Sequence, residues 1–465
     1  MSVNKKYEID MCNGSVPAKV LTFALPIIFS GILQLLFNAA DIVVVGRFAG
    51  DNSMAAVGST GSLVNLVTNL FIGLSVGANV LVARYYGAKD DEGLKKAVHT
   101  SVKLAIISGI ILTVVGVLGA KHLLVLMKAP GEVLKLATIY LRVYFLGMVA
   151  MMIYNFGSAI LRATGDTKRP LYILIISGII NVLLNLLFVI VFQMDVAGVA
   201  LATVISQFVS AGLILLLLIK ADGAIKLDMK QLRIDRELIG DMAKIGLPAG
   251  FQGMLFSLSN VVIQSSVNLF GDTAIAGNSA AGSIEGFVYV AMNAFYQTAI
   301  SFTGQNYGAG KFERIKKILY SCIAFVGITG LVFGNLVSIF SPFLVGIYSK
   351  SSEVIAIGSG RLAVIASTYA LCGMMDVMVG MLRGLGYSIV PMFVSLIGAC
   401  GLRIVWIATV FQIEEFHKIE TIYYSYPVTW AITFAAHTIC FVIVYKKLMK
   451  RVRDRYRTES DMMEQ

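Results

Sequence analysis

The sequence carries little charge. Only 14% of its 465 residues are Asp, Glu, Lys or Arg, whereas soluble domains carry about 25%. Hydrophobic residues make up 57% of the chain. These proportions exclude an ordinary soluble domain and indicate an integral membrane protein.

The sequence also lacks the motifs of several enzyme classes. It contains no Walker A sequence, which excludes a built-in P-loop ATPase, and no HExxH or GxSxG motif in a context that would support hydrolysis. Its five cysteines show no CxxC or Cys/His spacing, so we interpret them as small apolar residues rather than metal or redox centres. We therefore expect no enzymatic activity, no bound metal and no cofactor.

Long apolar runs recur along the chain, and each comes near or exceeds the ~20 residues that cross a bilayer. We predict an all-α integral membrane protein with twelve transmembrane helices. Their approximate ranges are 17–46, 54–83, 96–120, 133–161, 170–192, 196–219, 239–270, 275–305, 315–346, 355–382, 390–412 and 423–446.

Short motifs occur twice at a constant offset. Gly87 stands in Tyr-Gly-Ala, as Gly308 does, and Arg162 follows a leucine, as Arg383 does. Both offsets are 221 residues (308 − 87 and 383 − 162). A constant register indicates two homologous halves. Six spans per half is an even number, so the halves are predicted to be parallel repeats, two six-helix bundles related by a pseudo-two-fold axis along the membrane normal.

The longest charged stretch inside the chain separates the two halves. We predict an N-terminal six-helix lobe at 1–220, a cytoplasmic linker at 221–237, a C-terminal six-helix lobe at 238–450 and a charged cytoplasmic tail at 451–465.

The net charge of +11 is distributed unevenly. Lys and Arg concentrate in alternate loops, which is the positive-inside pattern and predicts that both termini are cytoplasmic. This distribution argues against nucleic acid as a partner. The basic C-terminal tail is expected to rest near anionic lipid headgroups.

Three acids fall inside predicted spans: Asp41, Glu285 and Asp376. A carboxylate in the hydrocarbon layer costs several kcal/mol, so it is normally paired, neutralised or functional. Asp41 follows amide side chains at helical spacing, and amides recur in the second and fifth spans. We predict a site for H⁺ or Na⁺ formed by Gln34, Asn38, Asp41, Asn65, Asn69, Asn181 and Asn185. The alternative is a structural acid that pairs with Arg142.

The acids of the second half lie among amides, tyrosines and methionines. An acid in such surroundings can hold a lipophilic cation by charge and by contact with ring faces. We predict substrate contacts at Asn260, Gln264, Glu285, Tyr289, Asn293, Met375 and Asp376. The alternative is that the methionines only fill gaps between helices.

Two prolines interrupt predicted spans at equivalent positions, Pro26 in the first and Pro248 in the seventh. A proline inside a helix removes one hydrogen bond and leaves a kink. We predict hinges at both, with static shaping for packing as the alternative.

The quoted segments together resemble a known family. The segments are Phe37–Asp41 followed by Val45–Arg47, Arg84–Ala88, Leu161–Pro170 and Gly304–Lys311. They are similar to multidrug and toxic compound extrusion (MATE) transporters, especially the bacterial branch of the DNA-damage-inducible F type.

The resemblance implies alternating access around a central cleft and efflux of amphipathic, often cationic, small molecules, driven by H⁺ or Na⁺ influx. It also implies a bacterial plasma membrane protein, which we expect to be monomeric. The family's cation-site aspartate maps to Asp41, and its Asn and Asp pair maps to Asn181 and Asn185, so the second acid is replaced by an amide here. The alternative is a flippase for lipid-linked saccharides or another polar lipid. Such proteins tend to carry several Arg or Lys in the cleft, whereas the pocket charges here are acidic.

Overall fold

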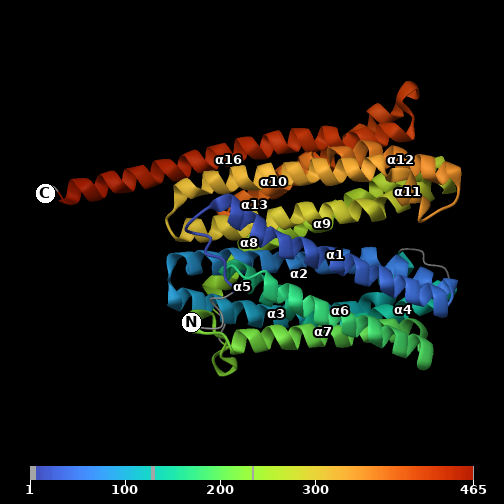
Figure 1. The fold of residues 1–465 in the computed structure, drawn as a ribbon, viewed down its shortest axis with the longest axis horizontal. Coiled ribbons are helices and arrows are strands. Elements are labelled where there is room, and N and C mark those ends of the chain that lie inside the picture. Colours follow the sequence, from blue (N-terminus) through green and yellow to red (C-terminus); the bar gives the residue numbers. More distant parts are fainter. Residues whose placement is uncertain (1–6, 127–130, 233–234, 464–465) are drawn as a thin grey trace. The chain divides into compact units, whose positions relative to one another are not determined.

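The computed structural model describes residues 7–126, 131–232 and 235–463. Within these ranges the chain is almost entirely helical and contains no strand (Figure 1). Each predicted span falls on one helix or on consecutive short helices. The chain divides into two compact units, Met1–Val261 and Val262–Gln465, which we call unit 1 and unit 2.

Unit 1 contains seven long helices and most of an eighth. They are α1 (Val16–Phe48), α2 (Asp51–Ala88), α3 (Asp91–Leu126), α4 (Gly131–Leu146), α5 (Met148–Thr164), α6 (Lys168–Leu186), α7 (Asp195–Ile219) and α8 (Arg236–Val267). A π-helical turn, η2 (Leu187–Val191), extends α6, and the short 3₁₀ turns η3 (Gly223–Ile225) and η4 (Met229–Gln231) precede α8.

Unit 2 begins with the end of α8 and the 3₁₀ turn η5 (Asn268–Phe270). Its helices are α9 (Asp272–Gly308), α10 (Phe312–Ile339), α11 (Ser341–Gly346), α12 (Ser352–Ile365), α13 (Tyr369–Gly384), α14 (Ile389–Ser395), α15 (Leu402–Ala408) and α16 (Ile419–Met463). The turn η6 (Ala366–Thr368) joins α12 to α13, and the π-helical turn η7 (Leu396–Gly401) joins α14 to α15. The 3₁₀ turns η8 (Val410–Gln412) and η9 (Glu414–Phe416) lead into α16.

Ten helices of the described residues are long and apolar enough to cross a membrane, and the pair α4 and α5, bent by 50° at Gly147, makes an eleventh candidate. The remaining predicted span is α9, which has 37 residues but is not among these candidates. It carries Glu285 and several amide side chains, which lower its hydropathy.

The internal repeat is visible in the backbone. Gly165 after α5 and Gly386 after α13 both adopt left-handed conformations, with φ of 104° and 86°. Their N–H groups donate to Arg162 O and Arg383 O, and the following residues donate to Leu161 O and Leu382 O. The same helix C-cap, the Schellman motif, thus occurs at equivalent positions. Glycine recurs there because an L side chain disfavours this conformation.

Helices α2 and α8 approach closely within unit 1. A Cβ atom on Gly77 would lie 2.2 Å from Met242 O, and one on Gly73 would lie 2.3 Å from Gly250 N. The two backbones therefore touch where glycines face each other, as is common between membrane helices. This part of α8 packs in unit 1, which ends at Val261 inside α8. The linker at 221–237 stays a prediction. The division into lobes stays a prediction.

Candidate functional site

A buried polar cluster joins three helices of unit 1. Asp41 of α1 is 8% exposed, and Asn185 of α6 is 1% exposed. The amide Nδ2 of Asn185 donates a hydrogen bond to Asp41 Oδ1 and lies 3.3 Å from Asn181 Oδ1. Asn181 Nδ2 donates in turn to Thr203 Oγ1 of α7, 3.3 Å away. We call these four residues the Asp41 cluster.

The Asp41 cluster gathers the oxygen atoms of one carboxylate, two amides and one hydroxyl. Asn185 Oδ1 is buried and has no hydrogen-bond partner in the part of the chain that the structure describes. A buried acceptor without a partner is unfavourable by about 1–3 kcal/mol. Hard cations prefer oxygen ligands, and a buried carboxylate can bind a proton. The donor set therefore fits one monovalent cation, Na⁺ or H⁺.

The structure does not support the alternative in which Asp41 pairs with Arg142. Arg142 is exposed, and none of the ion pairs formed by the described residues includes Asp41. The carboxylate is instead held by an amide, which leaves its formal charge uncompensated when it is ionised.

Sequence reasoning placed four further residues in this site. Gln34, Asn38 and Asn65 are exposed and Asn69 is half-buried, and the structure shows no hydrogen bond from any of them to the Asp41 cluster within the described ranges. Their participation stays a prediction. Thr203 was missed, although a hydroxyl in the apolar run from Val199 to Ile205 is the signal that would have found it.

The local backbone beside Asn185 is unusual. Asn185 is the penultimate residue of α6, and the π-helical turn Leu187–Val191 follows directly. Such turns accommodate one extra residue and occur often at functional sites. Helix α6 packs between α1 and α7, which brings its asparagines to both neighbours.

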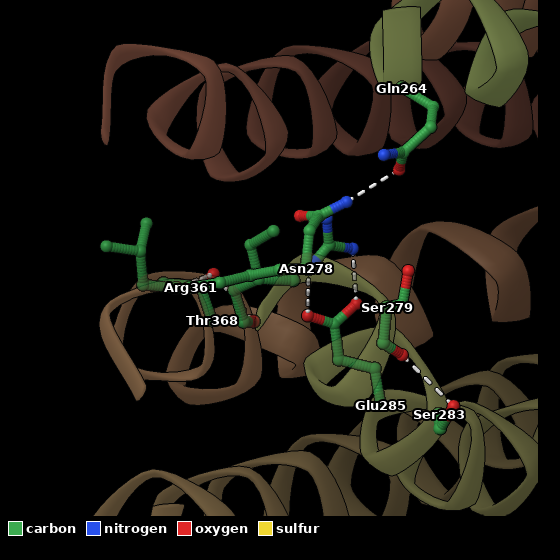
Figure 2. Close-up of polar contacts among 9 residues, drawn as sticks. Gln264, Asn278, Ser279, Ser283, Glu285, Arg361 and Thr368 are labelled. Carbon is green, nitrogen blue, oxygen red and sulfur yellow. Dashed lines mark hydrogen bonds and ion pairs between the residues drawn. The ribbon is translucent and has the colours of Figure 1, made fainter. Parts of the chain in front are cut away.

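A second polar cluster, buried at Asn278, Glu285 and Arg361, lies in unit 2 (Figure 2). Arg361 of α12 forms a bidentate ion pair with Glu285 of α9: Nε lies 2.7 Å from Oε1, and Nη2 lies 2.8 Å from Oε2. Arg361 Nη1 also donates to Asn278 Oδ1. Asn278 Nδ2 lies 2.6 Å from Gln264 Oε1, and Gln264 Nε2 lies 3.0 Å from Asn268 Oδ1. We call these five residues the Arg361 cluster.

The ion pair changes the interpretation of Glu285. Both side chains are buried, and the rings of Tyr423 and Tyr426 lie 5.9 and 5.7 Å from the Arg361 guanidinium carbon. A cationic substrate would have to compete with Arg361 for this carboxylate. Substrate contact at Glu285 and at Gln264 stays a prediction. No pattern in the sequence indicated that Arg361 and Asn278 contact Glu285 and Gln264.

The other predicted substrate residues lie outside the Arg361 cluster. Asp376 of α13 is half-buried and makes no hydrogen bond or ion pair among the described residues. Tyr289 is 42% exposed and Met375 is buried. Asn293 Oδ1 accepts a hydrogen bond from Gln297 Nε2, 3.4 Å away. Asn260 is exposed near the end of unit 1.

The two predicted hinges lie inside continuous helices. Pro26 is a buried residue within α1, and Pro248 lies within α8. The Ser30 hydroxyl donates to Pro26 O at 2.8 Å. Bending at either proline stays a prediction.

Comparison with known proteins identifies the family model that the chain matches. The MatE model matches residues 26–187 and again residues 248–409, which together make up more than half of the chain. The two matches begin at Pro26 and Pro248, as the internal repeat predicts.

Curated relatives align over most of the chain. It is 28% identical over 442 residues to "Probable multidrug resistance protein YoeA" of Bacillus subtilis (strain 168), with 93% of this chain and 95% of that protein covered. It is 22% identical over 367 residues to "Multidrug export protein MepA" of Staphylococcus aureus (strain NCTC 8325 / PS 47), with 79% and 81% covered. These proteins are named as resistance and export proteins, not enzymes.

A solved structure shares the fold. "Crystal structure of MATE in complex with MaL6" superposes with a TM-score of 0.88 at 22% identity, covering 95% of this chain and 98% of that one. The match confirms the predicted all-α membrane fold of twelve helices in two bundles.

Proposed function

Because the chain belongs to the MatE family, we propose that it is a secondary active antiporter for multidrug efflux. It exports amphipathic, often cationic, small molecules by alternating access, and the influx of H⁺ or Na⁺ drives the export. The names of the relatives YoeA and MepA support efflux of drugs. The coupling and the antiport mechanism are our proposal.

The main structural support for the proposal is the Asp41 cluster. It combines a buried carboxylate, an amide oxygen without a hydrogen-bond partner and no cationic side chain paired to Asp41 among the described residues. Cation binding there drives transport only through a difference in affinity between two conformations, because a ligand shifts an equilibrium by its differential affinity. Pro26 lies in the same helix as Asp41, so we place one bend at this proline. We place a second bend at the repeat-equivalent Pro248 of α8.

The substrate is proposed to contact the half-buried Asp376 together with Tyr289, Asn293 and Met375. Charge and ring faces attract lipophilic cations, and methionine adapts to varied shapes. A flippase for lipid-linked saccharides is the second candidate, and it would need open cationic side chains. Arg361 does not provide one, because Glu285 neutralises it.

We place the protein in the plasma membrane of a bacterium as a monomer with both termini in the cytoplasm. The bacterial relatives and the alternation of basic loops support this placement.

The proposal is tested with purified protein in proteoliposomes. Export of a fluorescent organic cation is measured under an imposed Na⁺ or pH gradient, and a fluorescent lipid-linked saccharide is measured in parallel. Gradient-dependent movement of the organic cation supports the proposal. Movement of the saccharide lipid alone, without dependence on either gradient, would establish the flippase instead.

A further inference from the structure

A groove of about 860 Å³ lies in unit 2 along α10 and α16, with Met378 of α13 also lining it. It is separate from the Asp41 and Arg361 clusters and plays no part in the proposed transport cycle. Figure 1 shows α16 running beside α10 toward the C-terminus.

One end of the groove is cationic. Lys316 of α10 lines it together with Lys446, Lys450 and Arg453 of α16, and Asp454 is the one acid among the described residues of the lining. The three basic residues of α16 are exposed and recur at intervals of three or four residues, so they share one helix face. Four cations against one anion give this end a positive potential.

The other end of the groove is apolar. Leu319 and Ile323 of α10 line it together with Phe434 and Phe441 of α16. Contacts fix the two helices in register: Tyr445 Oη donates to Phe312 O at 3.2 Å, and Lys316 Nζ lies 5.2 Å from the centre of the Tyr445 ring. Lys316 of α10 therefore lies beside the basic residues of α16, and the apolar lining residues of the two helices lie along the same stretch of the groove.

A groove that is cationic at one end and apolar at the other matches the shape and polarity of an anionic amphiphile. From Phe434 to Arg453 the face of α16 is about 28 Å long at 1.5 Å per residue, which is longer than the ~20–22 Å of one leaflet, half of a bilayer of about 40–45 Å, and so can accommodate a lipid of that leaflet. Basic pockets between membrane helices bind phospholipid headgroups. An amphipathic cation, the substrate class proposed above, is repelled by the four basic residues.

We propose that this groove is a binding site for an anionic phospholipid. The phosphate lies among Lys316, Lys446 and Lys450, and an acyl chain lies along Ile323 and Phe434. The two lysines of α16 and Lys316 come from different helices, so a bound phosphate would join the cytoplasmic ends of α10 and α16.

Helix α16 offers a matched control. Lys447 and Arg451 lie on the same turns as Lys446 and Lys450, are exposed, and do not line the groove. The variant Lys446→Gln/Lys450→Gln and the variant Lys447→Gln/Arg451→Gln therefore remove equal charge from the same segment. A third variant, Ile323→Trp, fills the apolar end and leaves every charge in place.

The full chain in detergent is titrated with dioleoyl phosphatidylglycerol or with dioleoyl phosphatidylcholine, and bound lipid is counted by native mass spectrometry. We expect phosphatidylglycerol to bind at least tenfold more tightly than phosphatidylcholine. The groove double variant should weaken phosphatidylglycerol binding on the order of tenfold, and the control double variant should change it less than about twofold. Ile323→Trp should weaken it without altering the charge.

Three results would overturn the proposal. Equal loss of phosphatidylglycerol affinity in both double variants would mean that the basic segment attracts the lipid diffusely. Equal affinity for the two lipids would mean that the headgroup charge is not recognised. Competition by inorganic phosphate at concentrations similar to the lipid would mean a free-anion site. Each variant is compared at equal monodispersity in size-exclusion chromatography, so that misfolding is not counted as lost binding.

Discussion

The side-chain amide of Asn185 donates a hydrogen bond to the carboxylate of Asp41, 144 residues earlier in the chain. The family that the sequence resembles has an acid at the position of Asn185. This chain therefore holds one negative charge where two are expected, and the amide contributes an oxygen without a partner in the described structure. Several predictions about coupling depend on this single substitution.

Asp41→Asn should abolish gradient-driven export, because a neutral amide cannot exchange a proton and binds Na⁺ weakly. The measurement is organic-cation export from proteoliposomes under Na⁺ and pH gradients. Thr22→Ala, on the same helix but exposed and outside the predicted cation site, is the control and should keep at least half of the wild-type rate. Full export by the Asp41→Asn protein would remove Asp41 from the coupling mechanism.

Asn185→Asp should shift the coupling ion toward H⁺. Two adjacent carboxylates do not both ionise readily, so one holds a proton near neutral pH. Export driven by a pH gradient should rise several-fold relative to export driven by Na⁺. Asn335→Asp in α10 adds the same charge at an exposed position outside both predicted sites and should leave the ion preference unchanged. If the two variants behave alike, the effect comes from net charge and not from the Asp41 cluster.

Arg361→Met should destabilise unit 2 by about 3–5 kcal/mol, because it leaves Glu285 buried without its partner. The double variant Glu285→Leu/Arg361→Met should recover more than half of that loss, since it removes both charges. Thermal unfolding in detergent measures both. Lys244→Met breaks an exposed pair with Asp241 and should cost less than about 1 kcal/mol. A double variant as unstable as the single one would show that the packing of Arg361, rather than its charge, is what matters.

Gly77→Ala should destabilise the contact of α2 with α8 by about 1–3 kcal/mol, because the new Cβ meets the Met242 backbone oxygen and backbone cannot move aside cheaply. Gly58→Ala, in the same helix, meets nothing within 4 Å and should be neutral or stabilising by about 0.5–1 kcal/mol. Melting temperatures of the two purified variants test the difference. Similar melting temperatures would contradict the close approach.

Pro26→Ala should slow export and raise thermal stability, since alanine restores an N–H that can donate to the carbonyl of Thr22 and stiffens α1. Pro170→Ala is the comparison, because Pro170 lies in the first turn of α6, where no helical hydrogen bond is lost. Unchanged export by the Pro26→Ala protein would assign this proline to static shaping.

The fold could be predicted from the sequence because two strong signals determine it. Apolar runs have lengths set by the bilayer, and the constant offset between halves fixes the repeat. The same offset appears in the backbone: Gly50 and Gly271, again 221 residues apart, precede α2 and α9 with φ of 90° and 85°. A left-handed turn before a helix leaves only a lone glycine in the sequence, which is a weak signal on its own.

The sites were harder to predict, because helical spacing shows which residues share a face but not what that face meets. Spacing grouped Asp41 with Asn38, yet of these two only Asp41 forms a hydrogen bond with α6 among the described residues. The pairing of Glu285 with Arg361 joins helices whose residues stand 76 apart, and no periodicity within α9 points to α12. Thr203 belongs to a third helix and carries no charge that would draw attention to it.

The π-helical turn at Leu187–Val191 has a consequence for chain length in related proteins. The extra residue that it holds comes after Asn185, so the orientation of the Asn185 amide is set by the count of residues from the start of α6 at Lys168. Deleting one residue from Leu187–Val191 would restore an ordinary helical turn and leave the amide in place. Inserting one between Lys168 and Asn185 would rotate it by about 100° away from Asp41. We expect insertions and deletions among homologues to fall after this asparagine and not before it.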